Sequence, residues 1–323
     1  AEAVGDLLTA KTKISHLAAL QQYEGSLRKR IEKLLSQLTD FRTQLELEID
    51  FLENDLDELD NETLIIGLAK LHSELKRLAK TGEEGLIIKD GLKVSLVGAP
   101  NVGKSSIFNS LLETERAIVT PIPGTTRDYL EEMISLDGYL VRVFDTAGLR
   151  NTTDQIETIG IKRSYEIIEG SHKILFVIDG DENKKEYDTL TKIVDANKII
   201  KILNKSDKFK EKELQQFQKD GYVICSTNDN SGLSELKSSL LNDIEISEEE
   251  LHSGILTNTR QITAVTKAAL SVNKALESLN NNMGYEFTAF DLKEASTALE
   301  EIIGKITSDD ILNNIFANFC IGK

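Results

Sequence analysis

The chain contains few of the residues that cross-link, kink or anchor a protein. Its 323 residues include two cysteines, three prolines and no tryptophan. Two cysteines, Cys225 and Cys320, are too few for a disulfide framework or a cysteine-based metal site, so we expect a reducing, cytoplasmic setting. No run of about 18 consecutive apolar residues is present, and we therefore expect no membrane-spanning helix. Hydrophobic residues (40%) and charged residues (28%) occur in the proportions of a soluble globular protein.

Positive charge is also scarce. Lysine and arginine number 38 against 54 aspartates and glutamates, which gives a formal net charge of −16. Such a charge repels nucleic acid and anionic lipid at long range and disfavours non-specific binding to either. It leaves open a local basic patch, or RNA held mainly by a partner. The basic cluster Arg28-Lys29-Arg30 is interpreted as a solvated helix face.

The start of the chain lacks the features of a leader peptide. Its first ten residues contain Glu2 and Asp6 and no basic start, so a secretory signal is not expected. An initiator methionine is also missing, because the two methionines are Met133 and Met283. We therefore expect the chain to be a piece of a longer protein.

The three prolines all lie between residues 100 and 123, so the rest of the chain can form long helices. Before residue 90 and after residue 255, apolar residues recur at the three- and four-residue spacing of a helix with one apolar stripe. A bundle that packs on itself is favoured over an intermolecular coiled coil, because the longest stripe is short and interrupted. Helices are predicted at Leu17–Leu52, Leu64–Ala79, Leu256–Leu279 and Phe290–Ile303, with interruptions at Asp60–Thr63 and Asn280–Tyr285.

Between these helical parts the pattern changes to short β-branched runs that alternate with helical segments. This order predicts a mostly parallel sheet with helices on both faces. Because both flanks are helical, we expect an α/β domain (89–245) inserted into one helical domain, whose two parts are residues 1–88 and 246–323. The strands are predicted at Leu92–Val97, Leu140–Phe144, Ile174–Ile178, Ile199–Leu203 and Tyr222–Cys225.

The segment Gly98–Ser105 matches the pattern G-x-x-x-x-G-K-[ST] of a phosphate-binding loop. It follows a predicted strand and precedes a helical run, Ser106–Leu112, which is the context that this motif needs. The backbone N–H groups and the helix N-terminus would bind phosphate, Lys104 would reach the β- and γ-phosphates, and Ser105 would ligate Mg²⁺. The nucleotide-binding residues expected here are Asn101, Val102, Gly103, Lys104, Ser105 and Ser106.

Two further segments would hold the metal ion and sense the γ-phosphate. Asp145-Thr146-Ala147-Gly148 ends a predicted strand, so Asp145 can hold Mg²⁺ through water and Gly148 can bind a γ-phosphate until hydrolysis. D-T-A-G is a weak signal alone and a strong one after a phosphate loop. In the segment Pro123–Asp128, Thr126 is the candidate Mg²⁺ ligand, and the alternative is a plain Pro-Gly turn.

The segment Asn204-Lys205-Ser206-Asp207, which follows a predicted strand, would select the base. The carboxylate of Asp207 can accept hydrogen bonds from N1–H and N2–H₂ of guanine. Adenine offers neither pair, and a buried carboxylate left unpaired is costly, so GTP is favoured over ATP. Cys225–Asn228 is a looser match to a loop covering the base, with Ser226 and Thr227 as nucleotide-binding candidates and Cys225 as a buried strand residue.

Residue 149, directly after D-T-A-G, is leucine, where many small GTPases have the glutamine that orients the attacking water. A leucine cannot orient water, so another polar group must do so. Glu157, near the start of a predicted helix at Glu157–Glu169, is the candidate. From the residues alone, a solvated carboxylate favoured by the helix dipole remains the alternative.

These elements in this order resemble the translation-factor-like GTPases over about residues 92–242. Further motifs are A-P-N-V-G-K-S-S, G-T-T-R-D, D-T-A-G-L-R, the segment Leu256–Arg260 and the terminal F-C-I-G-K. With them, essentially the whole chain resembles the MnmE family (also called TrmE) of tRNA modification GTPases. The fold class implied is an α/β GTPase (P-loop NTPase) domain inserted into an all-α helical bundle domain.

The resemblance implies roles for residues that the motifs alone leave open. The family's catalytic glutamate falls where Glu157 stands. The family uses K⁺ in place of an arginine finger, and the asparagine that ligates this ion matches Asn101. A loop matching about residues 118–124 encloses the ion, with Ile118, Thr120 and Pro123 as the expected contacts. A K⁺-dependent homodimer of the GTPase domains is implied as well.

The resemblance also implies what the protein acts on. The family installs a carboxymethylaminomethyl or aminomethyl group on the wobble uridine of tRNA, together with the flavoprotein MnmG. The carbon comes from 5-formyltetrahydrofolate, whose site, with the main dimer contact, is expected to precede this chain. Cys320 would lie near the modification site, and the alternative is a thiol without chemistry.

Two other readings of the GTPase motifs remain. A ribosome-assembly GTPase would use hydrolysis to time the release of RNA, but such proteins usually append a compact basic domain. Here the downstream segment is helical and acidic around Glu245–Glu250. A nucleotide-bound scaffold without turnover is the second alternative. The predicted ligands are thus GTP and GDP, and the predicted partners are tRNA and MnmG.

Overall fold

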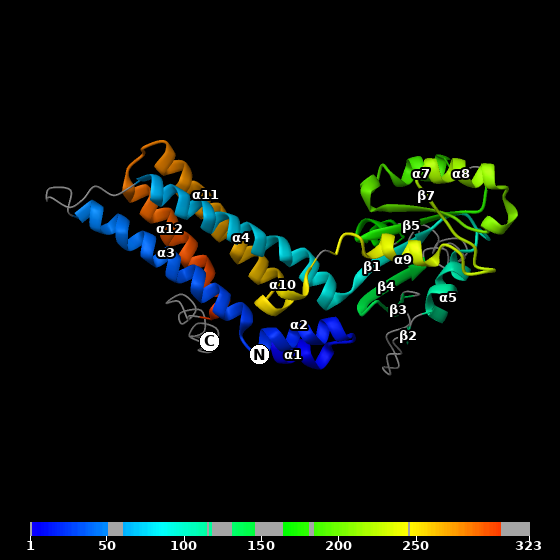
Figure 1. Ribbon diagram of the computed structural model, residues 1–323, viewed down its shortest axis with the longest axis horizontal. Helices are drawn as coiled ribbons and strands as arrows, with labels where there is room; N and C mark the ends of the chain where they lie inside the picture. Colours follow the sequence, from blue (N-terminus) through cyan, green and yellow to red (C-terminus); the bar gives the residue numbers. More distant parts are fainter. Residues whose placement is uncertain are drawn as a thin grey trace, which may run out of the picture. The chain divides into compact units, whose positions relative to one another are not determined.

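A computed structural model of the chain describes residues 2–50, 61–114, 116–117, 131–145, 164–180, 184–244 and 246–304. The chain divides into two compact units (Figure 1). The helical unit comprises residues 1–7, 17–86 and 246–323, and the sheet unit comprises residues 8–16 and 87–245. The predicted domain boundaries, after residues 88 and 245, stay a prediction. One difference is that residues 8–16, assigned by the sequence to the helical domain, group with the sheet.

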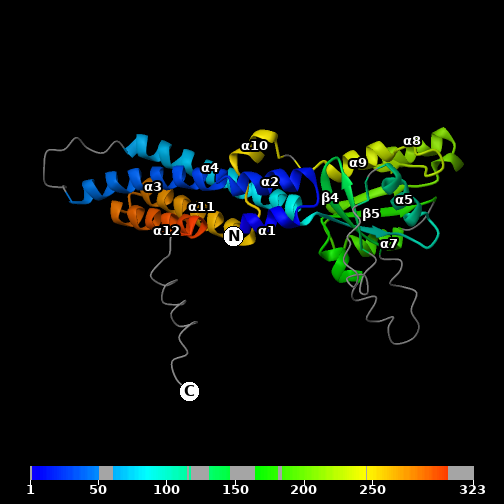
Figure 2. The same cartoon turned by 90° about the horizontal axis from the view of Figure 1, so that it is seen from below.

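Four long helices of the helical unit, α3, α4, α11 and α12, share one hydrophobic core and lie side by side in both views (Figures 1 and 2). The predicted stripe of α3 is buried at Leu27, Ile31, Leu34, Leu38 and Leu45. The apolar stripes are therefore covered within one chain, as the bundle prediction requires. The helices that lie wholly or partly in this unit are α1 (Glu2–Thr9), α2 (Lys13–Tyr23), α3 (Ser26–Asp50), α4 (Asn61–Asp90), α10 (Glu248–Ser253), α11 (Thr259–Asn280) and α12 (Tyr285–Ile303).

The long helices bury one face and expose the other. In α4 the buried residues Leu64, Leu68, Leu71, Leu75 and Leu78 recur at spacings of three and four. Their partners are the other helices of the bundle, so the apolar residues are in a stripe and not all around the helix. Among the described helices, none is both long enough and apolar enough to cross a membrane.

Several helix boundaries differ from the prediction. The helix expected from Leu17 onward ends at Tyr23 and restarts at Ser26, because Gly25 has a φ of 83° that stops helical geometry. Asp60–Thr63 was expected to interrupt a helix, but α4 begins at Asn61, whose following Glu62 suits the positive end of the helix dipole. Helices α1 and α10 have no counterpart in the prediction, and α12 begins at Tyr285, earlier than expected.

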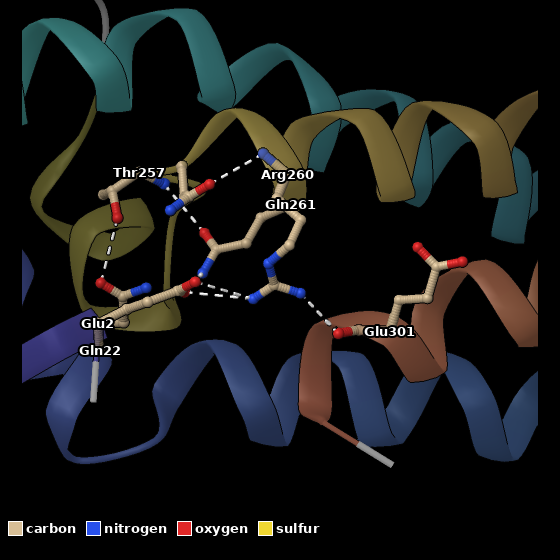
Figure 3. A network of polar contacts seen from close by, with 7 residues as sticks. Glu2, Gln22, Thr257, Arg260, Gln261 and Glu301 are labelled. Carbon is tan, nitrogen blue, oxygen red and sulfur yellow. Dashed lines mark hydrogen bonds and ion pairs between the residues drawn. The ribbon is translucent and has the colours of Figure 1, made fainter. Parts of the chain in front are cut away.

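A polar network ties the start of α11 to the ends of other helices (Figure 3). Arg260 donates from Nη1 to the backbone oxygen of Glu301 at the end of α12 (2.7 Å) and from Nη2 to the carboxylate of Glu2 in α1 (3.2 Å). The neighbouring Gln261 is buried and accepts from the Thr257 backbone N–H (3.3 Å). This segment overlaps Leu256–Arg260, one of the motifs that carries the family resemblance.

The sheet unit contains seven strands in the order β2-β3-β4-β1-β5-β6-β7. Five strands run parallel, which confirms the mostly parallel prediction, while β2 and β3 add an antiparallel edge that the sequence did not predict. The strands are β1 (Leu92–Val97), β2 (Arg116–Ala117), β3 (Glu131–Leu136), β4 (Tyr139–Asp145), β5 (Lys173–Ile178), β6 (Ile199–Leu203) and β7 (Tyr222–Ile224).

Helices cover both faces of this sheet (Figure 1). Alternate residues of β5 enter two separate cores: Leu175 and Val177 face one, and Phe176 faces the other. Because both faces are covered, β5 is buried along its whole length, as its continuous apolar run indicates. The first core includes residues of α5 (Lys104–Thr114) and α9 (Leu233–Leu241), and the second includes residues of helical segment 164–169, α7 (Lys184–Leu190) and α8 (Glu211–Lys219).

Candidate nucleotide site

The parallel strands end at one common edge of the sheet. Strand β1 lies between β4 and β5, and the chain passes from β1 to the β4 side before it returns to β5. Leu96 pairs with Asp145 of β4, and Leu203 of β6 pairs with both Ile178 and Ile224. The loops after these strands therefore meet where the strand order reverses, which is the usual ligand site of an open α/β sheet.

The loop after β1 has a backbone that requires its glycines. Gly98, Asn101 and Gly103 have φ values of 148°, 65° and 96°. A Cβ atom on Gly98 would lie 2.2 Å from the Val177 backbone oxygen, and one on Gly103 would lie 2.1 Å from Nδ2 of Asn204. Both glycines thus allow the loop to approach its neighbours closely, as the phosphate-loop pattern predicts.

The lysine of this loop is held at the loop itself. Lys104 is the first residue of α5 and is 6% exposed. Its Nζ donates to the backbone oxygens of Gly98 (2.8 Å) and Ala99 (2.7 Å). Ser105 and Ser106, in the first turn of α5, are exposed. A fixed ammonium group, the N-terminus of a helix and exposed hydroxyls are what a polyphosphate and its metal need.

Two residues after β6 tie the base-selecting segment to the phosphate loop. Asn204 is fully buried, and its Nδ2 donates to the backbone oxygen of Val102 (2.9 Å). Lys205 has a φ of 57°, and its Nζ donates to the backbone oxygen of Asn101 (2.7 Å) and to Oδ2 of Asp179 (2.5 Å). Residues that are about a hundred positions apart in the sequence are thereby brought into contact, and their binding of a nucleotide stays a prediction.

The carboxylate of Asp207 is exposed and oriented by two side chains. Its Oδ1 accepts from Oγ of Ser226 (2.9 Å), and its Oδ2 accepts from Nδ2 of Asn228 (2.9 Å). The hydrogen bond from Ser226, followed by the weaker effect of that from Asn228, holds the pKa of Asp207 below its ordinary value of 3.8. The group is therefore an anion near neutral pH. Each oxygen keeps capacity for a further hydrogen bond, because a carboxylate oxygen has two lone pairs.

The remaining residues of the loop after β7 differ in their surroundings. Ser226 is fully buried, while Thr227 is half-buried. Cys225 is fully buried directly after the strand, and burial raises the pKa of its thiol to about 12. The interpretation of Cys225 as a buried residue without chemistry is supported by both facts.

The sequence analysis did not single out two residues of this site. Asp179 pairs with Lys205, and Asn228 binds Asp207. A possible signal for Asp179 was its place directly after β5, at the same edge as the other loops. Asn228 belongs to the predicted base-covering loop Cys225–Asn228, but its hydrogen bond to Asp207 can be seen only in the folded structure.

Other predicted site residues lie outside what the structure describes. They include the candidate water-orienting glutamate, the expected K⁺ loop and the terminal cysteine, and for Asp145 only the backbone, at the end of β4, is described. Among the described residues, no group of three or more His, Cys, Asp or Glu could hold a metal ion. The residues outside the described ranges are Ile118, Thr120, Pro123, Thr126, Gly148, Glu157 and Cys320.

Comparison with known proteins identifies the family. A family model described as the MnmE helical domain matches residues 1–320. The chain belongs to the MnmE family. The chain is also similar over its whole length to two proteins named tRNA modification GTPase MnmE. The one from Christiangramia forsetii is 36% identical and that from Flavobacterium psychrophilum 39% identical, and the chain covers 73% and 72% of their lengths.

The MnmE relatives extend to distant organisms. The tRNA modification GTPase MnmE of Aquifex aeolicus is 39% identical, with all of this chain and 72% of that protein covered. Among solved structures, the G domain of the T. maritima FeoB iron transporter is 29% identical over 47% of this chain and 97% of that chain, with a TM-score of 0.35. A TM-score of that size carries no structural argument. The membership of the chain in a family of tRNA modification GTPases confirms the resemblance found in the sequence.

Proposed function

We propose that this chain binds GTP with Mg²⁺ and hydrolyses it, as a K⁺-dependent conformational switch in the modification of the tRNA wobble uridine. The observation that carries the proposal is the set of hydrogen bonds from Asn204 and Lys205 to the phosphate loop. These contacts place a candidate guanine-binding carboxylate, Asp207, on the segment that is fastened to the candidate phosphate-binding backbone.

The phosphate groups would bind to the loop 98–103 and to the first turn of α5. Lys104 would bind the β- and γ-phosphates, because its ammonium group is held at the loop by two backbone oxygens. The backbone N–H groups of Val102, Gly103 and Ser106 would donate hydrogen bonds to the remaining phosphate oxygens. The dipole of α5 acts in the same direction, because its positive end is at Lys104.

A magnesium site is supported by the donors available. Mg²⁺ prefers oxygen ligands, and the hydroxyls of Ser105 and Thr126 with the carboxylate of Asp145 offer only oxygen. Ser105 is exposed beside the loop, and the register of β4 against Leu96 brings Asp145 to the same sheet edge. Mg²⁺ held by these oxygens would supply positive charge to the phosphate groups during transfer.

A potassium site is proposed at the phosphate loop itself. Asn101 is exposed in the loop and has a positive φ, and such backbone conformations of residues other than glycine are concentrated at ligand-binding sites. We propose its side-chain oxygen as a K⁺ ligand, together with Ile118, Thr120 and Pro123. A monovalent cation there supplies the positive charge that an arginine finger supplies elsewhere.

The guanine base would be read by Asp207. The two protein donors that bind its oxygens fix the orientation of the carboxylate and leave lone pairs for N1–H and N2–H₂ of guanine. Lys205 would cover the base, and Thr227 would contact it from the next loop. ATP would be rejected, because adenine would leave the carboxylate without its partners.

Hydrolysis would need a water oriented by Glu157, since Leu149 cannot accept its proton. Gly148 would donate its backbone N–H to the γ-phosphate and lose that contact after hydrolysis. Two switch segments, residues 118–128 and 145–157, would then rearrange, and paired GTPase domains would pass this change to the helical domain. The modification itself would involve tRNA, the MnmG flavoprotein, 5-formyltetrahydrofolate and Cys320, and a cytoplasmic setting stays a prediction.

The proposal is tested by measuring hydrolysis of GTP and of ATP with Mg²⁺, in KCl and in NaCl at equal ionic strength. We expect turnover of GTP only, faster in KCl by about tenfold or more. Binding of GTP without turnover in either salt would favour the scaffold alternative. Equal turnover of ATP would contradict the role of Asp207, and equal rates in the two salts would contradict the K⁺ site.

A further inference from the structure

A cavity of about 460 Å³ lies in the helical unit between α3, α4 and α10. Its walls carry Lys29, Arg30 and Lys33 from α3 and Arg77 from α4. One carboxylate, that of Glu74, faces the same space. In a chain with a net charge of −16, this is a local concentration of positive charge.

The cations of this basic cavity differ from other cations on the same helix. Arg28 of α3 pairs with Glu32 (2.8 Å), and Arg42 pairs with Glu46 (3.1 Å), each one helical turn away. Within the described part of the chain, Lys29, Lys33 and Arg77 form no ion pair. Arg28 and Arg42 are thus paired on α3, whereas the cavity's four cations are opposed by two nearby carboxylates, those of Glu74 and Glu250, which act on Arg30.

One of the cavity's arginines is fixed in place. The guanidinium of Arg30 donates from Nη1 to the backbone oxygen of Gly254 (3.0 Å) and to Oγ of Ser253 (3.5 Å), directly after α10. Burial and the like charge of Arg77 lower the pKa of Arg30. Both guanidinium groups remain charged, since the ordinary pKa of arginine is far above neutral. An anion in the cavity would relieve their repulsion and bind to their remaining N–H donors.

We propose that this basic cavity binds the phosphate backbone of RNA. The two guanidinium forks match phosphate oxygens in geometry, and the basic residues are spread rather than gathered at one point. Lys29 and Lys33 are one helical turn apart, about 6 Å along the axis, so they present a row of charge. A row of cations suits a chain of phosphates better than a single small anion.

The proposal rests on the proposed function, in which tRNA is the substrate. An acidic protein repels RNA at long range, so a productive complex requires local sites where the sign of the charge is reversed. The basic cavity provides such a site within the described part of the helical unit. It also changes the interpretation of Arg28-Lys29-Arg30 as a plain solvated face, since Lys29 and Arg30 line the cavity while Arg28 is paired on the surface.

The test measures binding of a fluorescent, unmodified tRNA transcript to the full chain with GDP and Mg²⁺, between 50 and 200 mM KCl. The variant Lys33→Glu/Arg77→Glu reverses two exposed cavity charges without touching the hydrogen bonds of Arg30. The matched control, Lys70→Glu/Lys267→Glu, changes the net charge equally at exposed positions outside the cavity.

We expect the cavity variant to bind tRNA about tenfold or more weakly at 50 mM KCl. The slope of log affinity against log salt should fall by about 1.4 to 1.8, the value for two lost phosphate contacts. The affinity of the control variant for tRNA should stay within about threefold of that of the unaltered chain. Lys33→Gln/Arg77→Gln, which removes charge without reversing it, should show a smaller loss in the same direction and guards against misfolding of the reversed variant.

Several outcomes would overturn the proposal. They are an unaltered chain that does not bind tRNA, a cavity variant that binds as the unaltered chain does, and a control that loses as much. Competition by inorganic phosphate or by polyglutamate as effective as that by RNA, at equal ionic strength, would assign the cavity to another anion. GTP hydrolysis is measured in the same preparations, so a failure of the proposed GTPase activity is seen separately from a failure of RNA binding.

Discussion

The candidate nucleotide site and the basic cavity differ in how they hold most of their cations, although Arg30 of the cavity is also bound by a backbone oxygen. In the nucleotide site, Lys104 and Lys205 are each fastened by backbone oxygens, and Lys205 also by a carboxylate. In the basic cavity, Lys33 and Arg77 form no ion pair among the described residues. Fastened cations are pre-organised for one ligand of fixed shape, whereas unpaired exposed cations attract any chain of negative charge. The first kind of site should be specific and weakly affected by salt, and the second should be sensitive to salt.

The largest expected effect on GTP affinity is that of replacing Lys104, whose ammonium group is held by two backbone oxygens. Lys104→Ala removes the charge that meets the β- and γ-phosphates, and the affinity for GTP should fall by at least about 100-fold, the range for truncating one partner of a buried charge pair. Titration with a fluorescent GTP analogue measures this affinity. Lys192→Ala, an exposed lysine of the same unit, is the control. Comparable losses in both variants would show that the site has no special need for Lys104.

The second prediction separates binding from turnover. Glu157→Ala should leave GTP affinity unchanged and lower the rate of hydrolysis by about 10²-fold, the effect of removing a positioned general base. Single-turnover hydrolysis measures the rate, with Glu169→Ala, an exposed glutamate further along, as control. Hydrolysis at the unaltered rate would reject the water-orienting role.

The third prediction concerns the choice of base. Asp207→Asn replaces an acceptor by a donor, so GTP should bind about 10- to 100-fold more weakly and xanthosine triphosphate should bind better. Competition between the two nucleotides measures the change of preference. A variant that still prefers guanine as the unaltered chain does would exclude Asp207 as the residue that reads the base.

A smaller effect is expected from the residue that orients this carboxylate. Ser226→Ala removes the hydrogen bond that lowers the pKa of Asp207 most, so the pKa should rise toward 3.8 and GTP affinity should fall about fivefold. In the unaltered protein the lowered pKa contributes stability that is complete above pH 3.8 and is lost as the pH falls through the lowered value. Asp207 should therefore stay ionised between pH 7 and 5, and the ratio of the affinities for GTP and ATP, whose phosphates titrate alike, should not change in this range. A loss of the preference for guanine by pH 5 would contradict the assignment.

The smallest predicted effect lies in the helical unit. Arg260→Ala removes the hydrogen bond to the end of α12 and should lower the free energy of unfolding by about 1 kcal/mol. The ion pair with Glu2 adds little, because both side chains are nearly half exposed (46% and 44%). Urea denaturation measures the change, and Lys267→Ala on the same helix serves as control. If the two variants had the same free energy of unfolding, the polar network around Arg260 would not be stabilising.

The features that could be predicted from the sequence are those formed by residues that are close together in the chain. The candidate phosphate loop could be predicted because its glycines, Lys104 and Ser105 are neighbours in the chain. The stripes of α3 and α4 were found because helical packing repeats every few residues. The antiparallel strand β3 was missed, since Glu131 and Glu132 obscure its alternation and its partner is the next strand rather than a helix. The start of α12 differs from the prediction because of the turn at Gly284, which has a φ of 101°.

Contacts between distant segments explain the rest. Asp179 gave no sign of its pairing with Lys205, because the two loops meet only when β5 and β6 are aligned. The basic cavity was equally invisible, since Arg77 joins Arg30 from a different helix. A run of three basic residues on one helix predicts only a solvated face. The fold is needed to show that two of them, Lys29 and Arg30, share a cavity with two further cations, Lys33 and Arg77.

The most direct test of the account is calorimetric titration of the unaltered chain with GTP and with ATP, in MgCl₂ and KCl. The account predicts one GTP bound per chain and no detectable ATP binding at the same concentrations. Equal affinity for the two nucleotides, or no binding of either, would contradict it.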